Sequence, residues 1–477
     1  MVKSNPSAPP PPIVSPPITN SRHWLGLTLI LAVAAFLRFY DLAGPSLWMD
    51  EIWSIEISTG RGSAHDLLPS GSIQTQQYDL TTLTAAPPWW KIWTTMQRII
   101  HPPLYHIALR WWMDAFSNAP GPARALSAVF SLAAIAVFFD VTRLLHGPRT
   151  ALWAAALMTL SVAQIEFAQE ARSYPMLILL GLISCDLLIR IEQSGVNACR
   201  LTALAIALAA AQLTHYFAAP AIAALFLYAL LRLRGRDRLR TLAAFAAAIG
   251  FFAVVWGRQL IGQLHDLPTL APEFLKNYSQ SPLQKSLGLL LSLPAKFFTG
   301  DIFFIQHPQT ALIVATIAAA MIIPLPIFYA ITRRKDMLIW ILWLFAIVGF
   351  LACMDIFRRA NFLQYLRYSI LASPAVFAMV AAFSFPARRR QIRPVALIAL
   401  TASAYLAATR AIVGVPPKGD WRQLADLVQS YVPQNEVLAI YYHDPFVTPG
   451  MWYMAMHYYQ PESNRPWLLL RQPADAQ

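Results

Sequence analysis

Eleven apolar segments run through this chain, and they constrain its fold more than any other feature. They lie at 24–40, 121–142, 151–167, 174–189, 201–214, 218–231, 241–256, 309–331, 337–353, 367–386 and 394–410. A helix that crosses a bilayer needs about 20 mostly apolar residues. Only 13% of the residues are charged, against about 25% in ordinary soluble domains. The sequence therefore predicts an all-α polytopic membrane protein with about eleven transmembrane helices.

The positive charges predict which helix ends face the cytoplasm. Of the 37 Lys and Arg residues, 18 lie in six short segments that total 63 residues, with 232–240 and 388–390 as the clearest clusters. The segments of the opposite side total 221 residues and hold only 15. Because cytoplasmic loops are enriched in Lys and Arg, we expect the N-terminus inside and the C-terminus outside. The same pattern accounts for the net charge of +13, so no nucleic-acid partner is expected.

This orientation predicts a division of the chain into parts. Residues 1–23 form a Pro-rich cytoplasmic tail that we expect to be disordered. Residues 24–410 form the transmembrane domain, in which 41–120 is a catalytic outer loop and 257–308 is a second outer loop. Residues 411–477 form a small extracytoplasmic α/β segment. All three long non-membrane segments then share the outer face, so we expect any chemistry there.

Local patterns predict four further elements in these outer segments. Residues 87–100 begin with two prolines and mix Trp and Ile with Lys and Arg, which is typical of a helix in the headgroup plane; an aromatic anchor belt is the alternative. Residues 283–298 predict a second interfacial helix. In the tail, 420–431 predicts an amphipathic helix and 437–442 a strand.

A pair of carboxylates, Asp50 and Glu51, lies about ten residues after the first membrane helix. Adjacent carboxylates at a membrane surface are costly unless they are hydrated or paired. Such a group can serve as a general base, because apolar surroundings raise its pKa. The alternative is a solvated acidic turn, or a pair at a helix N-terminus that the helix dipole favours.

Two further motifs are candidates for binding. His101-Pro-Pro-Leu-Tyr105 holds an extended backbone, so His101 can face a site; the alternative is a helix-start turn with interfacial side chains. Glu170 and Arg172 precede Tyr174 between two membrane helices. Arg172 can hold a phosphate through its guanidinium fork, or Glu170 and Arg172 can form a structural pair.

Several outer-face residues add positive charge or hydrogen-bonding groups to these motifs. They are His215, Tyr216, Lys296, Arg358, Arg359, Arg367 and Tyr368. Each alone is more typical of a headgroup anchor, but together they are cations facing a carboxylate loop, which suits an anionic lipid substrate. Asp50, Glu51, His101 and His106 can also bind a metal, although nothing in their spacing demands one.

Taken in order, the motifs resemble those of the polytopic GT-C glycosyltransferases. They are Arg38 near the end of the first helix, Trp48-Met-Asp50-Glu51, His101-Pro-Pro-Leu-Tyr105, Gln169-Glu-Ala-Arg-Ser-Tyr174, Arg367-Tyr368 and Lys418-Gly-Asp-Trp-Arg422. The chain is most similar to the bacterial branch of the family 39/83-type enzymes, which are dolichyl-phosphate-mannose-protein mannosyltransferase-like. The resemblance covers roughly 24–410 and depends on the order of the motifs and their shared outer-face placement.

The resemblance implies transfer of a sugar, a mannose-like or other hexose or a pentose, from a polyprenyl-phosphate donor. The acceptor is a glycan, lipid or protein, and the active site faces the outside of the cell inner (plasma) membrane. The reaction inverts the anomeric carbon. The base of that family corresponds to Asp50, with Glu51 beside it.

The chemistry of such a transfer matches the residues available. A lipid phosphate leaves as a stable anion, so one base and several cations are enough and no general acid is needed. Arg172 and Arg367, with His215 or Lys296, are expected to hold the phosphate without a metal or other cofactor. The remaining candidates for substrate binding are His101, Tyr105, Glu170, Tyr174, Tyr216 and Tyr368.

Two rival functions stay open at this point. One is a membrane transporter or flippase for a lipid-linked saccharide, and the other is a membrane anchor without catalytic activity. Transporters place ionisable groups near the bilayer midplane and often show repeated halves. Here the acidic motif lies in an 80-residue outer loop and the chain shows no repeat, which favours the enzyme.

Overall fold

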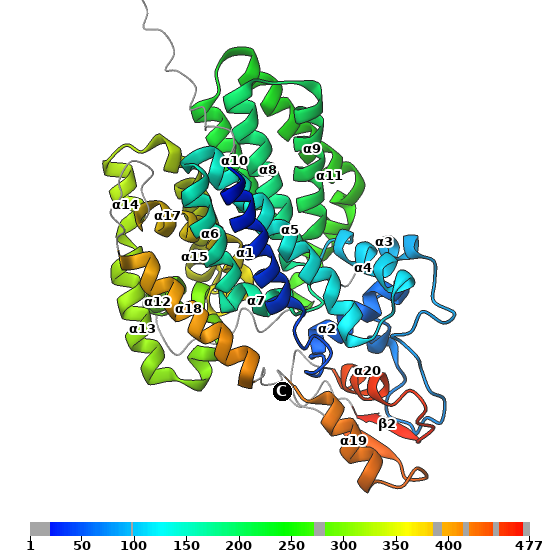
Figure 1. The fold of residues 1–477 in the computed structure, drawn as a ribbon. Coiled ribbons are helices and arrows are strands. Elements are labelled where there is room, and N and C mark those ends of the chain that lie inside the picture. Colours follow the sequence, from blue (N-terminus) through cyan, green and yellow to red (C-terminus); the bar gives the residue numbers. More distant parts are fainter. Residues whose placement is uncertain are drawn as a thin grey trace, which may run out of the picture.

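The computed structural model describes residues 20–96, 99–270, 282–384, 394–413, 419–441 and 448–470. Within these ranges the chain is a helical bundle with a small α/β unit at one end (Figure 1). Almost all of the expected disordered tail, 1–23, and the basic cluster 388–390 lie outside the described residues.

Most of the described chain belongs to the bundle. Its helices are α1 (Ser21–Phe39), α5 (Pro120–His146), α6 (Pro148–Leu160), α7 (Val162–Ala168), α8 (Tyr174–Ser194), α9 (Ala198–Thr214), α10 (Ala218–Arg232), α11 (Gly235–Leu270), α12 (Pro282–Gln306), α13 (Pro308–Ile322), α14 (Pro324–Ile331), α15 (Leu338–Arg358), α16 (Leu366–Ser369), α17 (Ser373–Ser384) and α18 (Pro394–Val413). A large apolar core lies between them and includes the fully buried Trp340 and Trp343.

Eight helices of the described residues are long and apolar enough to cross a membrane, and a ninth span results if α6 and α7 count as one. These two helices meet at Ser161 with a bend of 62°. Helices lie at all eleven expected segments, but α9 and α10 are short, with 17 and 15 residues. The chain is therefore a polytopic helical membrane protein, and within its described residues eight or nine helices reach the length of a full span.

The second outer segment, 257–308, is more helical than expected. Its first part continues α11, and α12 covers 282–306 instead of a shorter interfacial helix at 283–298. Helix α12 is one of the eight candidate spans. The other expected interfacial helix, at 87–100, is instead short: a 3-10 turn, Trp89–Lys91, leads into α3 (Ile92–Thr95).

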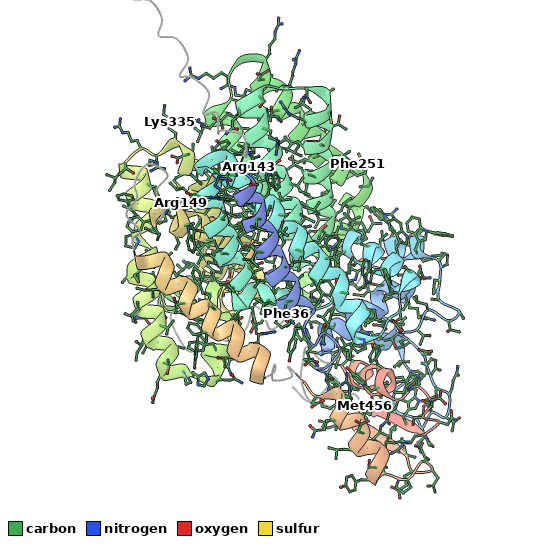
Figure 2. The ribbon with its side chains drawn as sticks, in the orientation of Figure 1. Phe36, Arg143, Arg149, Phe251, Lys335 and Met456 are labelled. Atoms are coloured by element: carbon green, nitrogen blue, oxygen red, sulfur yellow. The ribbon has the colours of Figure 1, made fainter. Side chains whose placement is uncertain are left out.

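The two ends of the bundle differ in character. Arg143, Arg149 and Lys335 lie at one end, and Met456 lies beyond the other (Figure 2). Phe36 and Phe251 project from the sides of the bundle and are 60% and 53% exposed. Exposed aromatic side chains along the sides of the bundle are typical of a surface that faces lipid.

The outer loop and the C-terminal segment gather at the end that carries Met456 (Figure 1). The loop contributes α2 (Met49–Glu56), α3 and α4 (Leu104–Ala115), and the segment contributes α19 (Trp421–Tyr431), β1 (Leu438–Tyr441), α20 (Pro449–Tyr459) and β2 (Trp467–Leu470). The expected helix at 420–431 and the strand at 437–442 are thus α19 and β1, although residue 442 is not described.

The C-terminal segment and the outer loop share one small sheet and one core. Strands β1 and β2 are parallel, with Leu438 opposite Trp467, and an antiparallel bridge joins Trp467 to Gln74 of the loop. Beside the sheet, Ile52 of α2 and Met454 of α20 belong to the same buried apolar cluster. The C-terminal segment therefore packs directly on the helix that carries the acidic pair.

Candidate active site

The acidic pair lies in the first turn of α2, where carboxylates suit the positive end of the helix dipole. The helix begins after Trp48, whose backbone N–H donates to Glu51 Oε2 at 3.2 Å. The two carboxylates have different environments. The side chain of Asp50 is 23% exposed, whereas that of Glu51 is fully buried.

Glu51 is fully occupied by structural contacts. The Arg124 guanidinium donates to both carboxylate oxygens, at 2.8 and 2.7 Å. The backbone N–H of Ala171 adds a third hydrogen bond at 2.9 Å. Glu51 was expected beside Asp50 in the catalytic pair, but it lies out of reach of solvent and ties α2 to α5 and to the segment before α8. This arrangement gives Glu51 a structural environment rather than a catalytic one.

Asp50 contacts two arginines that are distant in sequence. Arg367 Nη1 lies 2.9 Å from Asp50 Oδ2, and Arg172 Nη2 lies 3.6 Å from the same oxygen. Arg172 Nη1 also donates to the backbone carbonyl of Asp50 and to Ser54 Oγ, each at 3.1 Å. Asp50 Oδ1 has no hydrogen bond to the described residues, so it is available to a group that enters from solvent.

Three buried hydrogen-bond donors near Asp50 have no partner in the described part of the chain. They are Arg172 Nε, Arg367 Nε and His215 Nε2. A buried donor left unpaired costs about 1–3 kcal/mol, and more for a charged group. The two guanidiniums and the imidazole therefore have N–H groups that can donate hydrogen bonds to a ligand. The arrangement therefore suits an anion.

The His215 ring is neutral and carries its proton on Nε2. Its Nδ1 accepts the backbone N–H of Phe217 at 3.1 Å, so the ring proton belongs on Nε2. Burial, and then the positive charges of Arg172 and Arg367, lower the pKa of His215 to about 3. The ring of His101 lies 5.3 Å from that of His215. Burial and the charge of Arg172 also hold the pKa of His101 well below its ordinary value.

Aromatic rings line the two arginines. The Arg172 guanidinium lies 5.8 Å from the ring centre of Tyr174. That of Arg367 lies 5.0 Å from Tyr365, 5.1 Å from Tyr368 and 6.0 Å from Trp48. Cation–π contacts at these distances hold the planar guanidiniums in place. The rings thus preorganise the cations that face Asp50.

The other residues expected at the site lie elsewhere or act indirectly. The Tyr105 hydroxyl is buried against Ser127 Oγ at 3.1 Å. The Tyr216 hydroxyl contacts Gln263 and accepts a hydrogen bond from Trp256 Nε1 at 2.9 Å, so Tyr216 belongs to a separate cluster. Glu170 is buried and lies within electrostatic range of Arg367 and Arg410.

Lys296 reaches the site only through the segment that carries Arg367. It forms an ion pair with Asp301 at 2.8 Å and donates to the carbonyl of Gln364 at 3.4 Å. Asp301 Oδ2 accepts the backbone N–H of Leu366 at 2.9 Å. Both groups therefore fix the chain immediately before Arg367.

Sequence reasoning missed Arg124 and Asp301 as parts of this site. A lone arginine in an apolar run, such as Arg124, is a signal that it has a buried partner. Asp301 gave no such signal. Within the described residues, no group of three or more His, Cys, Asp or Glu side chains is arranged to hold a metal ion.

The buried, neutral histidines near the site should make the free energy of unfolding depend on pH in the acid range. Burial and the charge of Arg172 lower the pKa of His106 to about 3. In the unfolded chain a histidine has a pKa near 6.5, so between about pH 6.5 and 3 only the unfolded state takes up this proton. His106 therefore lowers the free energy of unfolding by about 1.4 kcal/mol per pH unit as the pH falls through that window.

We expect the melting midpoint of the purified protein in detergent to fall between pH 7 and pH 5. In the variant His106→Gln it should fall less steeply, because one titrating group is gone. Parallel slopes for the two proteins would contradict this account. The comparison of slopes is unaffected by any constant loss of stability in the variant.

Comparisons with known proteins bear on the fold. The family model described as dolichyl-phosphate-mannose-protein mannosyltransferase matches residues 100–257. The structure of the Archaeoglobus fulgidus oligosaccharyltransferase tethered with an acceptor peptide matches with a TM-score of 0.53 and 13% identity, over 94% of this chain and 64% of that chain. The arabinofuranosyltransferase AftD from Mycobacteria matches with a TM-score of 0.50 and 16% identity, over 88% of this chain and 30% of that one.

No curated protein matches the sequence. This chain spans less than two thirds of the archaeal protein's length. At these identities the structural likeness concerns the fold, and the family model covers the region from the residue before His101 to about two thirds of the way along α11.

Proposed function

Since the chain has the GT-C fold of membrane glycosyltransferases, we propose that it is an inverting glycosyltransferase. It transfers a hexose or pentose from a polyprenyl-phosphate donor to an acceptor hydroxyl or amide on the extracytoplasmic face of the cell inner membrane. The observation that carries the proposal is the partly exposed Asp50 between two arginines whose buried Nε–H groups have no partner among the described residues.

In the proposed reaction Asp50 is the base. Its carboxylate takes the proton of the acceptor as the acceptor atom attacks the anomeric carbon of the sugar. The new glycosidic bond forms on one face while the bond to the phosphate oxygen breaks on the other, and its electron pair leaves with the polyprenyl phosphate. The leaving phosphate is a stable anion, so the step needs charge stabilisation and no proton donor.

Arg172 and Arg367 are proposed to hold that phosphate. Each guanidinium has five N–H donors, and only some of them are used in contacts with Asp50 and Ser54. The Nε–H groups that remain are buried, where hydrogen bonds to an anion are strongest. His215 Nε2–H adds a neutral donor. Glu51 is proposed to position α2 through Arg124 and to take no part in proton transfer.

Sugar transfer by the purified protein tests the proposal. The protein in nanodiscs would be offered radiolabelled polyprenyl-phosphate sugars, one donor at a time, with membrane extract as the source of acceptor. Label that moves to a lipid, glycan or protein fraction supports the proposal and identifies the acceptor class. A folded protein that transfers label from none of the donors would refute it.

The arginines give a quantitative prediction. A hydrogen bond to a charged group contributes about 1.5–3 kcal/mol, so Arg367→Gln should weaken binding of polyprenyl phosphate about 10- to 100-fold. Binding can be measured by competition with labelled donor. Arg236→Gln is the matched control, because Arg236 is an exposed arginine in the first turn of α11 and is not among the site candidates. Equal affinity of the Arg367 variant and the wild type would remove Arg367 from the phosphate site.

A further inference from the structure

The turn that leads into α2 is held in an unusual way by two arginines. Its five consecutive backbone carbonyls, of residues 42–46, all accept hydrogen bonds from guanidinium groups. Arg124 of α5 donates to the first, fourth and fifth, at 2.8, 2.9 and 3.0 Å. Arg422 of α19 donates to the second and third, at 3.1 and 3.0 Å. One arginine belongs to the bundle and the other to the C-terminal segment.

Tyr459, at the end of α20, holds the next residue of the turn. Its hydroxyl accepts the backbone N–H of Leu47 at 2.6 Å and lies 3.1 Å from Ser46 Oγ. Ser46 Oγ also accepts the backbone N–H of Arg422 at 3.2 Å. The Arg422 guanidinium lies 5.5 Å from the ring centre of Tyr459, so the two side chains form one unit around the turn.

The same segment also packs against the apolar face of α2. Ile52 and Ile55 are fully buried in a cluster that includes Met451 and Met454 of α20. Helix α2 has only eight residues, and isolated helices much shorter than 12–15 residues are not stable in water. Its position therefore depends on tertiary contacts at its N-terminal turn and along this face.

We propose that the C-terminal segment is a positioning element of the active site, with Arg422 and Tyr459 fixing the turn that sets the place of Asp50. The inference rests on the proposed role of Asp50 as the base. Asp50 follows Leu47 by three residues, so a shift of the turn moves its carboxylate relative to Arg172 and Arg367. A displacement of about 1 Å in a reacting group can lower a rate about 100-fold.

Two variants test this inference, each with two measurements. Arg422→Gln removes the guanidinium from two carbonyls, and Tyr459→Phe removes the acceptor of the Leu47 N–H. In both we expect faster amide hydrogen exchange in peptides that cover 42–56. We also expect kcat to fall about 10- to 100-fold with the donor KM within about twofold of the wild type. Arg422→Lys, which keeps the charge but loses the fork, should be intermediate.

The controls lie on exposed positions away from the turn. Tyr431→Phe changes a tyrosine of α19 that is 80% exposed, and Arg236→Gln changes an exposed arginine at the opposite end of the bundle. Both should exchange and react as the wild type does. Exchange in 42–56 that is unchanged in Arg422→Gln and Tyr459→Phe overturns the inference, and so does faster exchange with an unchanged kcat.

The hydrogen-exchange measurement also separates this inference from the proposed function. A wild-type protein that transfers no sugar refutes the proposed function, while the exchange in 42–56 still shows whether the C-terminal segment holds the turn. A donor KM that rises as strongly as kcat falls would indicate a role of the segment in donor binding, and this too would overturn the positioning role.

Discussion

Replacing Asp50 by asparagine is expected to lower kcat for sugar transfer about 10³-fold, within the range of 10²–10⁴ that a general base contributes. Asparagine has nearly the same shape as aspartate but cannot take up the proton of the acceptor. Because Arg172 and Arg367 would face an uncharged amide, they would remain free for the phosphate, so donor affinity should not fall. Initial rates with saturating donor, together with donor competition, measure both quantities.

Asp114→Asn is the matched control for this substitution. Asp114 is an acidic residue of the same outer loop whose side chain is 45% exposed and pairs with Arg110 one helical turn away. Its replacement should leave kcat within about twofold of the wild type, since within the described residues no hydrogen bond or ion pair joins Asp114 to Asp50, Arg172 or Arg367, and an ion pair with a solvent-exposed carboxylate contributes little. A rate for Asp50→Asn that equals the wild-type rate would exclude Asp50 as the base while leaving the reaction class intact.

The largest effect on stability is expected at Glu51. The change Glu51→Gln leaves the Arg124 guanidinium buried without its counter-charge, and breaking a buried pair in this way costs about 3–5 kcal/mol. We expect a markedly lower melting midpoint in detergent and a low yield of folded protein. Asp114→Asn removes a carboxylate that is 45% exposed and leaves Arg110 its hydrogen bonds to the Thr59 and Pro87 carbonyls, so it should change stability by at most about 1 kcal/mol.

This prediction also separates the roles of the two adjacent carboxylates. Asp50→Asn, whose carboxylate is partly exposed, should lose less stability than Glu51→Gln but transfer little sugar, whereas Glu51→Gln should melt early. A Glu51→Gln protein with the wild-type melting midpoint and a 10³-fold lower kcat would contradict the structural role given to Glu51 and return it to the catalytic pair.

The sequence predicted the bundle well because membrane helices depend mainly on local apolar content. Every expected segment lies in a helix, but α12 was expected as a shorter interfacial helix because Lys285 and Lys296 interrupt its apolar run. In the structure these lysines are paired: Lys285 donates to Asn361 at 2.9 Å and Lys296 contacts Asp301 at 2.8 Å. Such pairing depends on residues far away in the chain, so the local pattern could not reveal it.

The sequence predicted which residues lie at the site better than it predicted the role of each residue. The order of the motifs brought forward Asp50, Arg172 and Arg367, which the structure places in contact. Adjacent residues of a helix point about 100° apart, so only one of Asp50 and Glu51 can face the arginines. The choice is made by Arg124, 73 residues away along the chain. His215 and Tyr216 are also adjacent in sequence but face different surroundings, because the Tyr216 hydroxyl contacts Gln263 and Trp256. The sequence does not indicate these partners.

The contacts around residues 42–46 have a consequence for how this region can evolve. Arg124 and Arg422 donate hydrogen bonds to backbone carbonyl oxygens, which every amino acid possesses. Most side chains of the turn can therefore be replaced without loss of these hydrogen bonds. This holds even at Gly44, where a Cβ atom would lie 2.1 Å from the Asp41 carboxylate, because that carboxylate ends an exposed side chain that can move aside. Selection should therefore conserve the two distant arginines and the length of the turn, while the amino acids of the turn itself vary. Homologues can then share the architecture of this region and lack any recognisable sequence motif within it.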